Sequence, residues 1–507
     1  MTLRALLFLL LAAHAAFAQS TLFTVENNGP RSQRINIVFL SEGYTTADMP
    51  NFSTHVNTAI NYLFSREPWA QYRSYCNVFR IQIASNQSGA DNGSAGGLKD
   101  TYFSSGFNNA GVPQLLTIEG TGPSRAFALL NQHVPEYDIP IVLVNDAKYG
   151  GSGGSIAVAS IHPSSAMVVE HEIGHSFAGL ADEYDAEYAG YFPSEKPNTT
   201  AQTVRNLIKW NAWIDATTPV EAPIYTPETA AYDDLVGLFE GSMYRTSGWY
   251  RPHNNSLMRS LNRPVGNVNR EQFVLSIYAQ IDPVEGWTPG GTSFSVSNFQ
   301  HLSFAVTTKQ TTPGSIETHW YIDNQLVPDA TTSAFAVISD VLGNGTHIVR
   351  AQTNDVTAFV RNDPSQSLKQ SVSWNVTLTN QLPATISAWR AAYGNDTNNL
   401  AQDGFVNLAK YAIGTNPAQP IGITQRPFVT ITPGSGSEQY LTLNVPRRTR
   451  RSDVTTEVEI SENLATWSSG PSYTVTLEDR DDLLVVRDAT PMGVGPNRSM
   501  RLRVTAP

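Results

Sequence analysis

The sequence His-Glu-Ile-Gly-His at positions 171–175 restricts the fold of this chain more than any other stretch does. Residues four apart lie on one face of an α-helix, so a helix here would direct the imidazoles of His171 and His175 toward one point. The apolar run at 166–169 indicates an interior helix, where two unpaired histidines would be costly. We therefore predict that the pair binds Zn²⁺ and that Glu172, beside the open position of the metal, accepts a proton from an activated water.

A zinc site of this kind needs a third protein ligand. Gly179 is expected to end the helix, because glycine readily adopts the left-handed conformation. The chain would then turn and bring an acidic side chain back to the metal. Asp182 is the first candidate for this ligand and Glu183 the second. The alternative for both is a solvated acidic turn.

The first 18 residues have the features of a secretory signal peptide. Arg4 lies near the start, an apolar run follows at 5–13, and small residues stand at Ala16 and Ala18. We expect cleavage after Ala18 and an exported chain that is secreted, periplasmic or held at the cell surface. No later stretch is apolar over enough residues to span a membrane.

The charge and cysteine content exclude several classes of protein. Outside the predicted signal, 32 basic residues stand against 44 acidic ones, a net charge of −12, which disfavours binding to nucleic acids and to anionic membranes. Cys76 is the only cysteine, so packed cores and bound ions must stabilise the chain without an intramolecular disulfide. At about 150 residues per domain, the length predicts about three domains.

Strands and helices alternate in the first part of the chain, which predicts an α/β layer. Strands are expected at 34–40, 77–83, 139–144 and 155–161, and helices at 45–64 and 124–133. The glycine-rich segment at 149–155 lacks the ending of a phosphate loop, and we interpret it as a flexible connector. The strand at 155–161 precedes the histidine helix, and as an edge strand it would pair with an extended peptide.

Six segments of this region share their pattern with one known group of proteins: 35–44, 149–153, 171–184, 237–241, 251–252 and 256–259. Together they resemble the IgA-peptidase family of secreted bacterial zinc metallopeptidases, over about residues 20 to 285. The resemblance implies a metzincin-like catalytic fold with Met258 in the methionine turn beneath the metal. It also implies Asp182 as the third ligand, although the spacing is one residue longer than in the usual metzincin motif, which keeps Glu183 open.

The surroundings of the expected methionine turn differ from the family pattern. Relatives often carry cysteines there, whereas this chain has Ser256, Gly266 and Asn269, so the turn must be held in another way. Tyr244 and Tyr250 lie upstream of the turn, and either is a candidate donor to the developing oxyanion, with ordinary packing as the alternative.

The rest of the chain predicts smaller modules. Alternating strands within 290–380 indicate an immunoglobulin-like β-sandwich, and 425–507 is expected to be a second β-domain. Between them, 383–420 is expected to form short helices and resembles calcium-linked modules of exported bacterial proteins, with Asp396 and Asp403 as the main Ca²⁺ ligands. A purely structural helical segment is the alternative.

These observations predict a signal peptide at 1–18 and a catalytic domain at 19–287, followed by the three modules. The predicted function is a zinc endopeptidase that hydrolyses protein or peptide substrates with Glu172 as general base. Two alternatives stay open. One is a zinc hydrolase of non-peptide amides or esters, and the other is an exported surface or matrix-binding protein with a vestigial peptidase domain.

Overall fold

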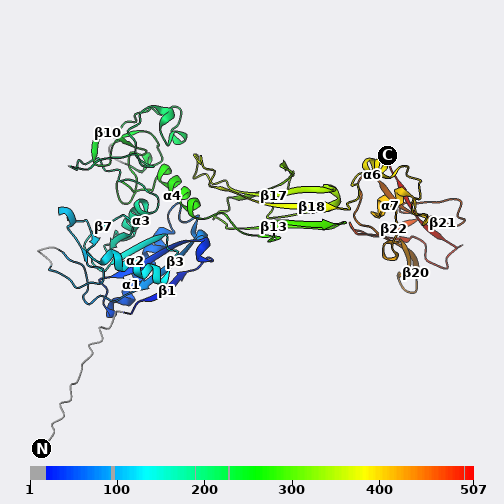
Figure 1. Cartoon of the computed structure of the whole chain (residues 1–507), viewed down its shortest axis with the longest axis horizontal. Coiled ribbons are helices and arrows are strands. Elements are labelled where there is room, and N and C mark those ends of the chain that lie inside the picture. Colours follow the sequence, from blue (N-terminus) through cyan, green and yellow to red (C-terminus); the bar gives the residue numbers. More distant parts are fainter. Residues whose placement is uncertain (1–18, 93–96, 189, 226–228, 496) are drawn as a thin grey trace, which may run out of the picture. The chain divides into compact units, whose positions relative to one another are not determined.

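The computed structural model describes residues 19–92, 97–188, 190–225, 229–495 and 497–507, so the predicted signal peptide lies outside the described residues. The chain divides into two compact units (Figure 1). The first contains the chain as far as Gly286 together with Thr307–Thr318 and Gln352–Ser371, and the second contains the remainder. Among the described residues, no helix is long and apolar enough to cross a membrane.

A six-stranded sheet forms the centre of the first unit. In sheet order its strands are β1 (Thr21–Glu26), β3 (Cys76–Gln82), β2 (Ile35–Glu42), β6 (Ile139–Val144), β8 (Ala157–Ser160) and β7 (Gly151–Ser152). The four inner strands are parallel, whereas β1 and β7 run antiparallel at the two edges. The strand predicted at 155–161 is therefore β8, an inner strand, and the edge next to it is β7.

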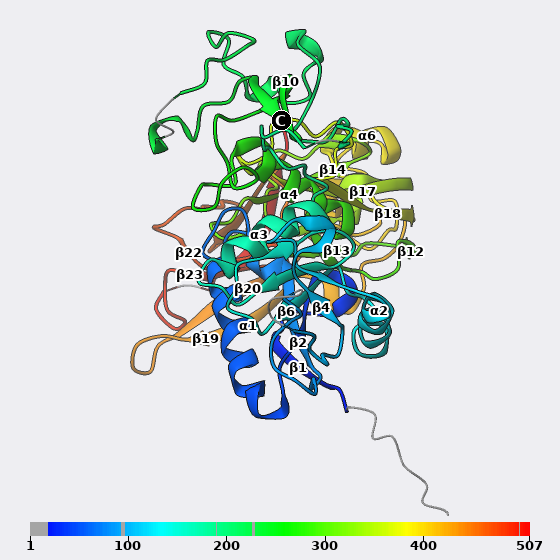
Figure 2. The ribbon, with the colours of Figure 1, turned by 90° about the vertical axis from the view of Figure 1, so that its left-hand side faces the viewer.

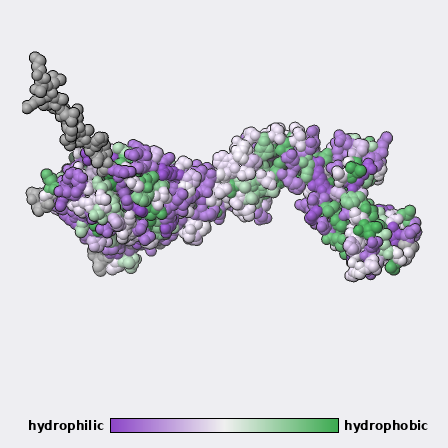
Figure 3. Space-filling view, turned by 90° about the horizontal axis from the view of Figure 1, so that it is seen from below, coloured by the Kyte–Doolittle hydropathy of each residue, from purple (hydrophilic) through white to green (hydrophobic). Residues whose placement is uncertain are grey.

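Helices cover both faces of this sheet, and the side-chain alternation along β2 shows why. Ile35, Ile37 and Phe39 pack in one buried cluster with α1 (Met49–Leu63), α3 (Ser165–Ser176) and α4 (Asn267–Gln280), whereas Val38 and Leu40 pack in a second cluster with α2 (Gly122–His133). Figure 2 shows α1 and α2 on opposite sides of the sheet. The face of this unit in Figure 3 is mainly hydrophilic, with scattered hydrophobic side chains.

Two short hairpins complete the first unit. One pairs β4 (Ser105–Gly106) with β5 (Thr117–Ile118), and the other pairs β9 (Phe239–Ser242) with β10 (Arg245–Arg251). A buried cluster of aromatic and aliphatic residues between 208 and 268 supports the second hairpin, and Trp210 and Trp213 are its largest members.

Two facing sheets form the β-sandwich that the alternating strands predict. The first has the order β11 (Val284–Thr288), β13 (His301–Thr308), β16 (Ala334–Ile338), and the second has the order β12 (Ser293–Ser297), β18 (Lys369–Thr379), β17 (Gly345–Asp355), β14 (Ile316–Ile322), β15 (Gln325–Leu326). The ring of Trp320 stacks on Phe335 and Trp374, with centroid distances of 5.3 and 5.8 Å, so aromatic side chains fill the space between the sheets. A short helix, α5 (Ser339–Leu342), follows β16.

The C-terminal part combines two helices with two small sheets. The helices are α6 (Ile386–Tyr393) and α7 (Asn407–Ile413); one sheet contains β19 (Phe428–Pro433), β20 (Gln439–Pro446), β23 (Leu483–Asp488) and β22 (Thr474–Asp479), and the other contains β21 (Thr455–Ser461) and β24 (Ser499–Thr505). The helices and the return to strands agree with the prediction for this region.

The structure favours the structural alternative to the calcium interpretation of 383–420. The carboxylate of Asp403 lies 2.9 Å from the ammonium of Lys410, both side chains are buried, and two backbone N–H groups also donate to it. Asp396 receives two hydrogen bonds from the guanidinium of Arg390, at 3.0 and 2.7 Å. Each carboxylate is thus neutralised by a cationic side chain, and the structural alternative accounts for the motif.

Candidate metal centre

Helix α3 carries both histidines on one face, as their spacing predicts. The two Nε2 atoms of His171 and His175 lie 3.1 Å apart. Each Nδ1 atom donates to a backbone carbonyl, that of Leu257 at 3.0 Å for His171 and that of Leu180 at 2.8 Å for His175. These bonds place a proton on Nδ1 of each ring, so both Nε2 atoms face a common point where, once deprotonated, they could offer their lone pairs to one ion.

Asp182 completes a triangle with the two imidazoles. Its Oδ1 atom lies 3.2 Å from Nε2 of His171 and 3.3 Å from Nε2 of His175. Burial opposes ionisation of Asp182, but hydrogen bonds from both histidines outweigh it and hold the pKa of the carboxyl far below its usual range. Burial likewise disfavours protonated His171, yet Asp182 and Glu172 raise the pKa of this imidazole to about 9.

The triangle has the dimensions of a tetrahedral metal site. Ligand atoms about 2.0–2.1 Å from a tetrahedral Zn²⁺ lie about 3.3–3.4 Å from one another, close to the separations in this chain. Two imidazole nitrogens and a carboxylate oxygen are donors that zinc accepts in enzymes. His171, Glu172 and His175 also offer ligand atoms within 4.8 Å of one another. Asp182 fits the third position better than Glu172, because its oxygen lies closer to both nitrogens.

Glu183 belongs to a different network from Asp182. Its side chain is fully buried and accepts hydrogen bonds from Asn198 at 2.9 Å, Asn269 at 3.0 Å and the hydroxyl of Ser256 at 2.8 Å. The structure therefore does not bring Glu183 to the histidines. Ser256 and Asn269, which stand where relatives often carry cysteines, hold Glu183 and with it the segment before the expected turn.

Met258 lies directly beneath α3. It is fully buried, and a Cβ atom added to Gly174 would be only 2.7 Å from its sulfur. Gly174 thus allows the thioether to approach the helix between the two histidines. The backbone carbonyl of Met258 accepts the N–H of Glu183 at 2.9 Å, which joins this segment to the loop that carries Asp182.

The two candidate tyrosines are placed differently. The hydroxyl of Tyr244 donates to Oδ2 of Asp182 at 2.7 Å, and the ring lines the pocket around the histidines. Tyr250 instead packs in the buried cluster with Trp210 and Trp213, and it is not among the residues that line this pocket. The structure therefore places Tyr250 in ordinary packing, the alternative to the oxyanion role.

A pocket of about 390 Å³ opens over the site, and glycines form one of its walls. A Cβ atom added to Gly153 would lie 2.8 Å from Oε2 of Glu172 and 2.9 Å from Cβ of His175. The segment that the sequence predicted to be a flexible connector thus contains strand β7 and lies against the side chains of Glu172 and His175. On its outer side Gly151 donates to the carbonyl of Gln114 at 3.2 Å, so the chain's own 114–116 segment occupies part of this edge.

Sequence reasoning missed two further parts of the site. Tyr184 stacks on the imidazole of His171 with a centroid distance of 6.2 Å and an interplanar angle of 21°. Val112, Gln114 and Leu115 also line the pocket. The four glycines at 150, 151, 153 and 154 were the sequence signal that could have indicated a close approach of the backbone to the site.

Residues 23–231 match the model of a family described as IgA Peptidase M64. No curated protein matches the chain. A solved structure similar to part of it is the 3Ig structure of titin domains I67-I69, E-to-A mutated variant, at 9% sequence identity and a TM-score of 0.12; the match covers 44% of this chain and 59% of that one.

The family match includes all of α3 and the loop that carries Asp182. It ends before the Met258 segment, which the structure itself brings beneath the helix. The match confirms the resemblance that the sequence motifs carry. Residues 23–231 of this chain are therefore identified as a region of the IgA Peptidase M64 family.

Proposed function

We propose that this chain is an exported zinc endopeptidase. The observation that carries the proposal is the convergence of Nε2 of His171, Nε2 of His175 and Oδ1 of Asp182 to within 3.1–3.3 Å of one another, with Glu172 in the same pocket. These three atoms would hold the metal, and the pocket side would leave a position open. Bound Zn²⁺ supplies Lewis-acid chemistry, which polarises a carbonyl and acidifies a water.

Glu172 is the proposed general base. Its carboxylate is buried, and burial raises its pKa, opposed by the nearby histidines. A raised pKa suits a group that must accept a proton from the attacking water and then donate it to the leaving amine. Gly151 and Gly153 face the two oxygens of this carboxylate and restrict where it can point.

Tyr244 has two proposed tasks that use the same hydroxyl. In the structure this hydroxyl donates to Asp182 and orients it, and both Met243 and Tyr244 have positive φ values, of 50° and 60°. A bulky residue adopts this conformation only when its surroundings require it, which supports a functional placement of the ring. With substrate bound, the same hydroxyl is close enough to the pocket to donate to a developing oxyanion.

The decisive experiment compares the mature protein with Glu172→Gln. We expect both proteins to retain stoichiometric zinc and the same unfolding temperature, while casein cleavage by the variant falls by roughly 10²–10⁴-fold. Glu136→Gln, which changes an exposed carboxylate of the same unit, is the matched control and should cleave normally. Unchanged cleavage by Glu172→Gln, or a purified protein that binds no zinc, would contradict the mechanism.

The pocket favours a peptide over a small amide or ester. A second cavity adjoins it and shares six lining residues, so the accessible space exceeds what a single amide group fills. An intact Glu172 also argues against a vestigial site, which needs no base. A panel of proteins, peptides and small amide and ester substrates would separate these classes, and we expect cleavage of the peptides alone.

We further propose that the β-sandwich is immunoglobulin-like. Its larger sheet has the order β12-β18-β17-β14-β15 and its smaller sheet the order β11-β13-β16. In such a domain β14 would be strand C, where a buried tryptophan is characteristic, and Trp320 of β14 is fully buried. A spacer or binding role for this module follows only by analogy.

A further inference from the structure

Five tyrosines line the cavity beside the metal pocket. This outer chamber has a volume of about 710 Å³, a size typical of ligand pockets. Its tyrosines are Tyr149, Tyr184, Tyr188, Tyr191 and Tyr244. Three of the residues that it shares with the metal pocket are Tyr149, Tyr184 and Tyr244, so the two spaces are continuous.

The tyrosines form an ordered group around one ring. The centroid of Tyr244 lies 4.9 Å from that of Tyr191, 5.6 Å from that of Tyr184 and 6.0 Å from that of Tyr188. Tyr188 and Tyr149 nevertheless keep 46% and 41% of their surface exposed. Exposed aromatic faces gathered in one concave site are unusual on a protein surface and mark a binding site for apolar or aromatic groups.

The charged side chains of this chamber are already paired. Asp185 lies 3.0 Å from the guanidinium of Arg259. Glu187 accepts hydrogen bonds from Arg245 and from both the N–H and the hydroxyl of Thr246. A charged substrate side chain would have to displace one of these partners, whereas an uncharged ring requires no such exchange.

We infer that the outer chamber is the specificity subsite of the enzyme and that it binds an aromatic side chain of the peptide substrate close to the scissile bond. The inference rests on the proposed endopeptidase function. Because the chamber is continuous with the metal pocket, the aromatic side chain bound in it would belong to the same peptide as the carbonyl that reacts. Tyr188 is the main specificity residue, because its ring is exposed in the chamber and packs against the ring of Tyr244.

A binding assay on the zinc-loaded full-length Glu172→Gln protein tests the inference independently of turnover. The probes are fluorescent peptides of alanine and serine in which one position at a time carries Phe, Leu, Lys or Glu. We expect one position where Phe lowers Kd by about tenfold relative to alanine, as one or two added aromatic contacts would give, while Lys and Glu do not.

Two variants locate this preference. Tyr188→Ala removes an exposed ring, and Ala186→Trp fills the chamber without removing any wall; each should bring the Phe and Ala peptides to equal Kd. Tyr473→Ala removes a ring of similar exposure, 44%, in the second unit and should preserve the preference.

The outcomes separate the subsite from the proposed function. Equal Kd for the Phe and Ala peptides, or a preference that survives in both chamber variants, would overturn the subsite. Peptides that bind with the expected preference but are not cleaved by the wild-type protein would overturn the endopeptidase proposal and leave the aromatic subsite in place.

Discussion

At the scale of single residues, two adjacent carboxylates have different surroundings, one at the proposed metal position and the other among hydrogen-bond donors. Asp182 faces the imidazole nitrogens, whereas Glu183 faces Ser256, Asn198 and Asn269. The sequence could not separate them, because both follow the helix end at a distance from which either could return to the metal. The choice depends on tertiary partners that lie between 15 and 86 residues from Glu183 in the chain.

The two residues should respond oppositely to substitution. Asp182→Ala removes a ligand oxygen, so we expect zinc binding to be lost or weakened by orders of magnitude with the fold retained. Glu183→Gln places an amide N–H₂ against groups that are themselves donors, and should lower stability by about 1–3 kcal/mol while zinc remains bound. Metal stoichiometry and thermal unfolding measure both effects. Loss of zinc from Glu183→Gln alone would reverse the assignment.

Asp138 gives the fold a distinct pH dependence. Burial raises the pKa of its carboxyl to about 6, although the backbone N–H of Asn36 donates to it at 2.7 Å. The folded state thus holds the proton more tightly than the unfolded state, whose pKa is near 3.8. This contribution to stability is complete below pH 3.8 and is lost as the pH rises through 6, by about 3 kcal/mol in total.

Replacement of Asp138 tests this. Asp138→Asn keeps an acceptor for Asn36 and carries no charge, so the variant should be more stable than the wild type above pH 6 and no more stable than it near pH 4. Denaturant unfolding between these pH values measures the difference. Parallel stability curves for the two proteins would contradict the explanation.

At the scale of secondary-structure elements, local pattern predicted most of the fold. β-branched runs located β2, β3, β6 and β8, and the four-residue spacing of histidines located α3. The order of strands was not predictable, because it depends on pairing between distant segments. For that reason β8 was expected at the edge and the glycine-rich segment was not recognised as β7. The sequence could not distinguish Tyr244 from Tyr250 for the same reason, because their different surroundings depend on how β9 pairs with β10.

The position of β7 against the catalytic helix makes Gly153 sensitive to a single methyl group. Gly153→Ala would press on Oε2 of Glu172 and on His175, both within 2.9 Å of the added carbon. We expect kcat/KM to fall by roughly tenfold to a hundredfold through misplacement of the base, with little loss of stability. Gly286→Ala, where an added Cβ meets nothing within 4 Å, is the control. Equal kcat/KM for the two variants would contradict this role of β7.

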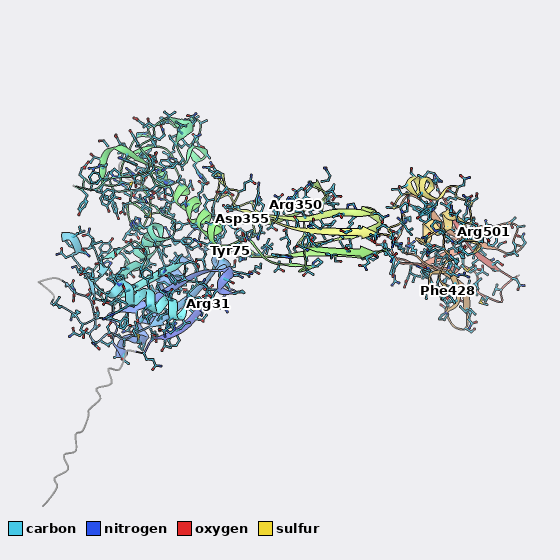
Figure 4. All side chains as sticks on the ribbon, viewed as in Figure 1. Arg31, Tyr75, Arg350, Asp355, Phe428 and Arg501 are labelled. Atoms are coloured by element: carbon cyan, nitrogen blue, oxygen red, sulfur yellow. The ribbon has the colours of Figure 1, made fainter. Side chains whose placement is uncertain are left out.

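At the scale of the whole molecule, the catalytic unit includes two segments that follow it in sequence. Asp355 accepts hydrogen bonds from the hydroxyls of Tyr72 at 2.6 Å, Tyr278 at 2.7 Å and Ser315 at 2.6 Å, and all four residues belong to the first unit. Tyr75 joins the network through Tyr278 at 3.0 Å, and Figure 4 shows Tyr75 and Asp355 close together. The end of the catalytic domain that the sequence predicts, at 287, differs from the end of this unit. The hydrogen-bond network connects residues almost 300 positions apart, beyond that boundary.

A fragment that ends at 287 lacks Asp355 and Ser315 and leaves buried tyrosine hydroxyls without their acceptor. We expect it to unfold at a clearly lower temperature than a fragment that ends at 380. In the full-length chain, Asp355→Ala should destabilise the catalytic unit by about 3 kcal/mol, because several buried donors lose their acceptor together. Equal melting of the two fragments would show that the unit is complete at 287.

The support of the metal-site turn by Glu183, Ser256 and Asn269 has a consequence for the conditions in which the protein works. Hydrogen bonds are indifferent to the redox state of their surroundings, so the site should assemble equally well in a reducing cytoplasm and in an oxidising compartment. Activity should be unchanged by a phosphine reductant that does not compete for zinc. A fall in activity with that reductant would mean that Cys76, the single cysteine of the chain, forms a disulfide with another molecule, which its burial should prevent.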